Sequence, residues 1–166
     1  MFEKFTVESR RAIYFARREA LGRRSRSIRP AHILLGILCQ QPALKTAWPA
    51  TAPAVEELLS EVTKALPAVV DSSRDWQIPL SEEGKRVLRA ADSSSRLFSH
   101  QHIGLEHLLA GLVAYEPRFW ERLGLRYSLK RYLAQKGMVP ATLKEHLCAL
   151  QQPIATYETK LEGGND

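Results

Sequence analysis

Histidine is the residue type in this chain best suited to metal binding or proton transfer. His32 and His107 each stand directly before an apolar run, and His100 and His102 lie shortly before His107. A metal site would also need Cys or carboxylate ligands at a suitable spacing, and a catalytic site would need a nucleophile paired with a base or two suitably spaced carboxylates. Neither pattern is evident. We therefore expect a protein with no enzyme activity, no metal and no cofactor.

Arginine dominates the charged residues of the first third of the chain. Residues 1–50 carry a net charge of +7, while the whole chain carries +6. Such a run is usually a solvated face, but it can also meet an acidic partner or a nucleic-acid backbone. Nucleic-acid sites often interleave basic and aromatic residues, and no aromatic residue lies between Arg17 and Arg29. Binding of nucleic acid is therefore kept only as the alternative function. The candidate basic patch comprises Arg17, Arg18, Arg23, Arg24 and Arg26, and Arg29 at the end of the same run is a candidate partner-binding residue.

Length and composition indicate one globular domain or two small fused halves. Apolar residues make up 45% of the 166 residues, which is enough for a buried core. No stretch approaches the roughly 20 apolar residues that span a bilayer, and the N-terminus lacks the apolar segment of a signal peptide. Cys39 and Cys148 are far apart, which is typical of buried free thiols in a reducing compartment. We expect a cytoplasmic protein that does not bind membranes.

The chain contains an internal duplication with a constant offset. Residues 5–38 align with residues 80–113 without a gap, and seven of the 34 positions are identical. Thr6 falls on Ser81 in this alignment, and His32 falls on His107. Both copies contain the motif Ile-x3-His-(Ile/Leu)-Leu-x-Gly, which ends at a glycine, Gly36 or Gly111. A fixed offset together with a shared motif indicates a structural repeat.

Each copy is predicted to contain two helices. Thr6 and Ser81 suit the N-cap of the first helix, because their hydroxyl groups can accept hydrogen bonds from free backbone N–H groups. In the first copy this helix is expected to close at Gly22. Second helices are predicted from about Pro30 to Gln40 and from about Leu105 to Ala114.

The residues shared by the two second helices have structural interpretations. Gly36 and Gly111 lie inside these helices, where glycine costs about 1 kcal/mol relative to alanine, so they indicate a close approach between helices. His32 and His107 are interpreted as half-buried residues that are hydrogen-bonded to the other helix of their own repeat.

The remaining segments are less alike. Pro42, Pro49 and Pro53 are expected to break up residues 41–53. Further helices are predicted over residues 54–66, 117–124, 128–137 and 140–151. Trp76, in the segment between the two copies, is the aromatic residue best placed to contact a partner or to fill a groove.

These motifs resemble the N-terminal domain of the Clp/Hsp100 unfoldases, particularly of the ClpC and ClpA type. The resemblance rests on Phe5-Thr6 before a basic and apolar helix, on Ile28 to Gly36 and on Ile103 to Gly111, and it covers roughly residues 1–137. It implies a pseudo-twofold pair of helical repeats at the entrance of an ATP-driven ring, where the domain binds adaptors and substrates. Gly84-Lys85 lacks the flanking residues of a phosphate loop, so we expect a free-standing domain without ATPase modules.

The resemblance also implies a phosphoarginine pocket, because some members of the family bind that ligand. Such a pocket needs a carboxylate for the guanidinium group, and a helix start with a hydroxyl group for the phosphate. The second copy keeps Ser81 and Glu106 for these roles. The first copy keeps Thr6, but it has Arg29 and Ala31 where the family has Gly and Glu. The alternative is that Thr6 and Ser81 only cap helices and that Glu106 only favours a helix start.

We therefore predict an all-α fold of tandem pseudo-twofold helical repeats with an additional C-terminal helix. The first repeat is placed at residues 1–66, a linker at 67–79, the second repeat at 80–137, the extra helix at 138–152 and a flexible tail at 153–166. The predicted function is non-catalytic protein binding, as an accessory, adaptor or substrate-recognition piece of a Clp-type ATP-dependent protease. The predicted partners are Clp ATPase or protease subunits, adaptors or substrates, with phosphoarginine as a candidate ligand of the second repeat.

Overall fold

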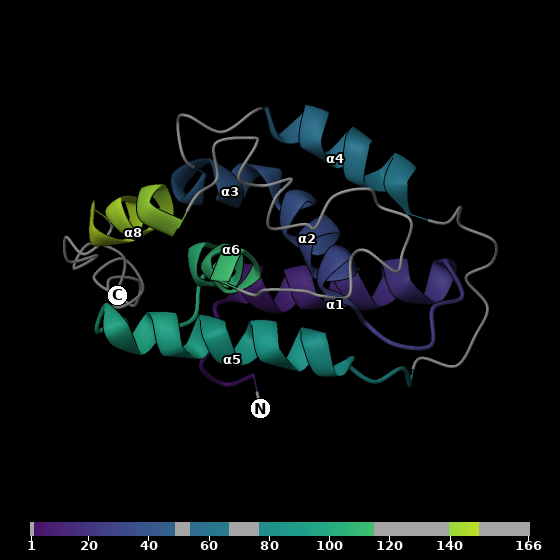
Figure 1. Ribbon diagram of the computed structural model, residues 1–166, viewed down its shortest axis with the longest axis horizontal. Coiled ribbons are helices and arrows are strands. Elements are labelled where there is room, and N and C mark those ends of the chain that lie inside the picture. The colour runs from purple at the N-terminus through teal and green to yellow at the C-terminus, as the bar shows by residue number, and fades with distance from the viewer. Residues whose placement is uncertain (1, 49–53, 67–76, 115–139, 150–166) are drawn as a thin grey trace, which may run out of the picture.

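The chain folds into helices, as predicted (Figure 1). The computed structural model describes residues 2–48, 54–66, 77–114 and 140–149. Within these ranges no strand occurs, and pairing of the β type is limited to two isolated bridges. The described helices are α1 (Val7–Gly22), α2 (Pro30–Leu38), α3 (Gln41–Ala47), α4 (Val55–Ala65), α5 (Glu82–Leu97), α6 (Leu105–Ala114) and α8 (Pro140–Ala149).

The pairs α1–α2 and α5–α6 are two copies of one helix pair. Helix α5 begins and ends at the repeat positions equivalent to the ends of α1, and α6 begins at the position equivalent to the start of α2. In both pairs the helices cross at a glycine. A Cβ atom on Gly36 would collide with the backbone of Ala12, and one on Gly111 would collide with the backbone carbonyl of Val87. Since Ala12 and Val87 are also equivalent in the repeat, the predicted close approach is confirmed in both copies.

The turn after the first helix of each pair also repeats. Arg24 (φ 52°) and Ser99 (φ 57°) both have a left-handed backbone conformation. In each turn the N–H of the following residue donates to the carbonyl oxygen five residues earlier, which is the hydrogen bond of a Schellman cap. Helix α1 ends at Gly22 as predicted, but the left-handed residue is Arg24 and not the glycine.

Two reciprocal backbone bridges join the two helix pairs. Phe5 forms a parallel bridge with Ile103, and Ile28 forms a parallel bridge with Leu80. Residues 5 and 80 are equivalent in the repeat, and so are residues 28 and 103. Each bridge therefore joins the same two repeat positions, with the roles of the two repeats reversed. This reciprocity is what an approximate twofold axis between the repeats produces.

The second helix of each pair lies at the centre of the fold. Every residue of α2 is buried, and seven of the ten residues of α6 are buried. The two helices contact each other, while α4 packs against α2 and α8 packs against α6 (Figure 1). Burial of these apolar helices is the main source of stability, because it removes the largest apolar surfaces of the chain from water.

The prediction for residues 41–53 is wrong in part. A short helix, α3, runs from Gln41 to Ala47 with Pro42 in its first turn, where proline has no intrahelical hydrogen bond to lose. The predictions for α4 and α8 are confirmed within two residues. Cys39 and Cys148 are free but exposed, so the prediction that both thiols are buried is wrong. The predicted helices over 117–124 and 128–137, most of the linker with Trp76, and the tail at 153–166 lie outside the described residues.

Candidate functional site

Thr6 and Ser81 cap the first helix of their repeats. The Thr6 hydroxyl oxygen accepts a hydrogen bond from the Ser9 N–H at 3.2 Å, and the Ser81 hydroxyl oxygen accepts one from the Gly84 N–H at 3.0 Å. The Thr6 hydroxyl group also donates to the Ser9 hydroxyl oxygen at 3.1 Å. The predicted capping role of both residues is therefore confirmed.

Each of these capped helix starts lies beside the other repeat. The Thr6 N–H donates to the carbonyl oxygen of Ile103 at 3.1 Å, just before α6, and the Ser81 N–H donates to that of Ile28 at 3.0 Å, just before α2. The sequence analysis grouped Ser81 with Glu106 because both belong to the second repeat. The structure instead brings the Thr6 backbone to the segment just before α6, whose first turn carries Glu106.

His32 and His107 close the start of their own helices. The Nδ1 atom of His32 accepts from the Arg29 N–H at 3.0 Å, and that of His107 accepts from the Gly104 N–H at 2.9 Å. Both side chains are fully buried, at 3% and 0% exposure. The prediction of half-buried rings bonded to the other helix of the repeat is wrong, because both rings are fully buried and reach back to the residue three positions earlier, as in a capping box.

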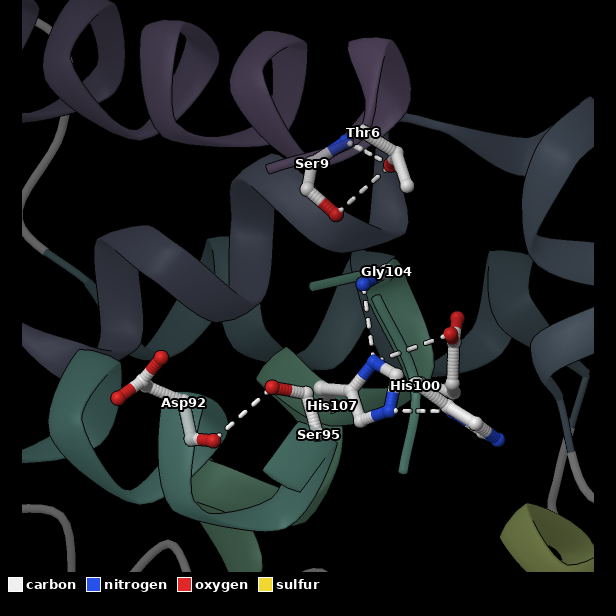
Figure 2. Close-up of polar contacts among 8 residues, drawn as sticks. Thr6, Ser9, Asp92, Ser95, His100, Gly104 and His107 are labelled. Carbon is white, nitrogen blue, oxygen red and sulfur yellow. Dashed lines mark hydrogen bonds and ion pairs between the residues drawn. The ribbon is translucent and has the colours of Figure 1, made fainter. Parts of the chain in front are cut away.

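A cluster of polar side chains distinguishes the second repeat from the first (Figure 2). The Nε2 atom of His107 lies 2.8 Å from the Nδ1 atom of His100, and a Glu106 carboxylate oxygen lies 3.1 Å from the Nδ1 atom of His107. The equivalent positions in the first repeat hold Ser25 and Ala31. Of the three members of the cluster, only the capping histidine is present in both repeats.

Burial and neighbouring charges set the protonation of these groups. Burial, followed by the positive charges of Arg29 and Arg23, lowers the pKa of His32 to about 4. Burial and the proximity of His107 lower the pKa of His100. Burial acts to raise the pKa of Glu106, but its close contact with the His107 imidazole outweighs burial and the pKa is lowered. Glu106 is thus a carboxylate near neutral pH, and His32 is a neutral imidazole.

The second-repeat cluster has the residue types of a metal site, but its hydrogen bonds fit another arrangement. His100, Glu106 and His107 can each place one ligand atom within 4.8 Å of the others. However, the Nδ1 atom of His107 accepts from Gly104, so a neutral ring carries its proton on Nε2, the atom that faces His100. Because a protonated nitrogen cannot bind a metal, the geometry favours a chain of hydrogen bonds from Gly104 to His100.

A groove lies between the N-terminal segment and α5. Its cavity volume is about 640 Å³, and its apolar lining consists of Phe2, Phe5, Leu88 and Ile103. The two phenylalanine rings pack edge to face with centroids 5.2 Å apart. Phe5 and Ile103 also form one of the bridges between the repeats, so the joint of the fold builds one side of the groove.

Charged side chains of both signs surround this apolar lining. Lys4, Lys85 and Arg89 are basic, and Glu82 and Asp92 are acidic. Lys85 and Glu82 form an exposed ion pair at 2.6 Å. Sequence reasoning missed this groove, because Phe2 and α5 are brought together only by the contact between repeats.

The structure separates the members of the predicted basic patch. Arg23 is buried and pairs with Glu19 at 3.2 Å. Arg18, Arg24 and Arg26 are exposed, whereas Arg17 and Arg29 are half-buried. The five arginines of the patch therefore do not form one continuous solvated run, and neither does the run that includes Arg29. Trp76 lies outside the described residues.

Comparison with known families identifies the repeat. The sequence matches the Clp repeat (R) N-terminal domain over residues 4–121. The chain belongs to this family. An uncharacterized protein of Mycobacterium tuberculosis is 33% identical to this Clp N-terminal domain over 115 residues, which cover 69% of the present chain and 45% of the relative. The ClpA homolog of Cyanidium caldarium, an ATP-binding subunit of the ATP-dependent Clp protease, is 30% identical over 117 residues, 68% of this chain and 13% of that protein.

Solved structures agree with the fold of this Clp N-terminal domain. The N-terminal domain of ClpD from Arabidopsis thaliana superposes with a TM-score of 0.58 at 22% identity, covering 92% of this chain and 97% of the other. The N-terminal domain of Hsp104 from Candida albicans gives a TM-score of 0.66 at 19% identity, covering 90% and 93%. These likenesses confirm the all-α class. Among the described helices, none has the length and apolar character needed to cross a membrane.

Proposed function

We propose that this chain is a non-catalytic protein-recognition module of Clp-type proteolysis, which acts as an accessory, adaptor or substrate-binding piece. Membership in the Clp N-terminal family supports the link to Clp proteins. The groove between Phe2 and α5 is the single structural feature that carries the proposal. The matched region accounts for less than half of the mycobacterial relative and for a small part of the ClpA homolog.

The chemistry of the groove suits a peptide segment. An apolar lining next to charged side chains binds an apolar side chain of a partner while fixing the orientation of its polar backbone and neighbours. Since the rim carries both Lys85 and Glu82, it can pair with either sign of charge. The partners that fit are a Clp ATPase or protease subunit, an adaptor, or an unfolded segment of a substrate.

Phosphoarginine is the finer candidate ligand, and we propose that it binds at the joint of the repeats. The start of α1 offers backbone N–H groups and the Thr6 hydroxyl group for a phosphate, and Glu106 offers a carboxylate for a guanidinium group. Both lie on the side where Thr6 meets Ile103. The Glu106 carboxylate contacts His107 in the absence of a ligand, so it would have to turn outward to bind a guanidinium group.

Direct binding measurements test the proposed function. Purified Clp ATPase and Clp protease subunits from the organism that encodes this chain, and unfolded casein, would be passed over the immobilised chain. We expect saturable binding of at least one of them, and a loss of about tenfold or more when Lys85→Glu and Arg89→Glu are combined. Arg86→Glu is the matched control, since Arg86 is exposed on the same helix but does not line the groove. Absence of binding to all three probes, or equal loss in the control, would contradict the proposal.

A further inference from the structure

The exposed face of α1 combines arginine with tyrosine. Its buried face consists of small and apolar residues that pack into the core, including Ala12, Ile13 and Ala16. On the opposite side, Arg11, Tyr14 and Arg18 follow one another at intervals of three and four residues, which places them on one face of a helix. Arg11 and Arg18 are exposed, and Tyr14 keeps 53% of its surface exposed.

This face is positively charged, and few carboxylates oppose it. All positive charges between residues 5 and 44 are arginines, and the carboxylates in that range are Glu8 and Glu19. Glu19 pairs with the buried Arg23. None of the ion pairs formed within the described part of the chain involves Arg10, Arg11 or Arg18. These three guanidinium groups are therefore available to a partner.

Aromatic contacts hold part of this face in place. The Arg18 guanidinium carbon lies 4.6 Å from the centroid of the Phe15 ring, a cation–π contact. The Tyr14 and Phe15 rings meet edge to face, with centroids 6.1 Å apart. Side chains that are ordered before binding lose less conformational entropy when a partner arrives. The face is thus partly preorganised.

We propose that this face of α1 binds single-stranded nucleic acid, with a base stacked on Tyr14 and with backbone phosphates paired to Arg10, Arg11 and Arg18. Arginine suits phosphate because its planar guanidinium group can form two parallel hydrogen bonds. An exposed aromatic ring between arginines suits a base, because every base presents a flat π-face. A peptide rich in carboxylates would use the arginines but would have no use for the ring, so the combination favours nucleic acid.

The helix supplies the aromatic residue that the arginine run lacks in the sequence. Tyr14 precedes Arg17 along the chain, yet the helical turn sets it between Arg11 and Arg18 on the surface. Arg24 and Arg26, which follow the end of α1, are exposed as well. This surface shares no residue with the lining of the groove, so the proposal does not depend on the protein-binding function.

The second repeat provides an internal control. Its residues equivalent to Arg11, Tyr14 and Arg18 are Arg86, Arg89 and Ser93, so the same face of α5 has no aromatic residue. If positive charge alone were sufficient, both faces would bind a polyanion. If the ring is required, α1 alone binds.

Fluorescence anisotropy of a labelled oligothymidylate of about 15 nucleotides tests the proposal. We expect binding that weakens as salt is raised, with the slope of log K against log salt falling by about 0.7 for each arginine removed in Arg11→Ala and Arg18→Ala. Tyr14→Ala should weaken binding about tenfold, and Tyr14→Phe should retain it. Arg86→Ala on α5 should leave binding unchanged.

Two results would overturn the proposal. One is the absence of an anisotropy change at low salt. The other is full displacement of the oligonucleotide by polyglutamate, together with an unchanged affinity of Tyr14→Ala, which would mark the face as a site for acidic protein. Thermal unfolding followed by circular dichroism shows whether each variant is still folded. Because the substituted side chains are exposed, we expect melting temperatures close to that of the wild type, so a lost anisotropy change reflects lost binding.

Discussion

Thr6 of the first repeat donates its backbone N–H to the carbonyl oxygen of Ile103 in the second repeat, at 3.1 Å. Ser81 and Ile28 form the equivalent contact in the opposite direction, at 3.0 Å. Each repeat therefore caps its own helices, while one backbone hydrogen bond in each direction ties the helix starts of the two repeats together. The groove lined by Phe5 and Ile103 lies at this joint, and the proposed phosphoarginine pocket is assigned to the same joint.

Removal of either N-cap should destabilise the fold by a similar amount. Thr6→Ala and Ser81→Ala each delete the oxygen that accepts from the first turn of a helix, so each should cost about 1 kcal/mol of unfolding free energy. Thr6→Ser keeps the acceptor and serves as the control. Urea denaturation measures the difference. A loss confined to one of the two alanine variants would show that the repeats do not share their stability equally.

Adding a methyl group at the helix crossings should be more harmful than removing a cap. In Gly36→Ala the new Cβ atom meets the carbonyl group of Ala12, which is rigid backbone inside α1. The helices must separate, at a cost of roughly 1–3 kcal/mol, although alanine is the better helix former. Gly111→Ala should cost less, because its clash with Val87 is less severe. Melting temperatures measure both variants, and a stabilised Gly36→Ala would contradict the close packing described here.

Local signals in the sequence were sufficient for the helices of the two repeated pairs and for their tandem arrangement, but not for α3. The start of α1 after Thr6 and the start of α2 at Pro30 follow from residue types whose preferences act within one turn. The fixed offset between His32 and His107 then predicted that the second helix pair repeats the first. Both the helix starts and the repeat offset follow directly from the sequence, so no knowledge of contacts between distant residues was needed.

The arrangement of the site could not be predicted in the same way. The alignment pairs Ser81 with Glu106 because it assigns residues to repeats, whereas the contact between Thr6 and Ile103 depends on how the two repeats dock. The hydrogen bond between His100 and His107 also escaped prediction, since the His100 position is serine in the first repeat and the repeat motif gives no signal there. Docking is decided by the packing of the whole core.

The stability of the fold should depend on pH through His32. Its pKa is lowered to about 4 in the folded chain, from 6.5, so the unfolded state binds a proton at a pH where the folded state does not. Stability should therefore be full above pH 6.5 and fall as the pH drops from 6.5 towards 4, by up to about 3 kcal/mol. Urea denaturation at several pH values measures the loss.

The variant His32→Gln separates the contribution of His32 to the pH dependence of stability from that of the other titrating groups. Glutamine at the same position can reach back to the Arg29 N–H, as in a capping box, but it does not titrate. The variant should lose less stability than the wild type over the same pH range. Parallel curves for the two proteins would show that His32 is not the source of the acid sensitivity.

Restoring a carboxylate to the first repeat should create a second phosphoarginine site, if phosphoarginine binds as proposed. Ala31 occupies the position equivalent to Glu106, and Arg29 occupies that of Gly104. An added glutamate next to Arg29 would pair with that arginine, so the variant should combine Ala31→Glu with Arg29→Gly. The ligand would then lie between the new carboxylate and the start of α5 at Ser81, which meets Ile28 at the joint.

Calorimetry with phosphoarginine distinguishes the outcomes. We expect one site in the wild type, none in Glu106→Gln, two in the Arg29→Gly and Ala31→Glu variant, and one when all three changes are combined. Binding by the wild type with none by the triple variant would show that the first repeat lacks more than a carboxylate. If neither the wild type nor the Arg29→Gly and Ala31→Glu variant releases heat with phosphoarginine, this ligand is removed from the proposed function. The groove beside Phe2 then remains as the proposed recognition surface.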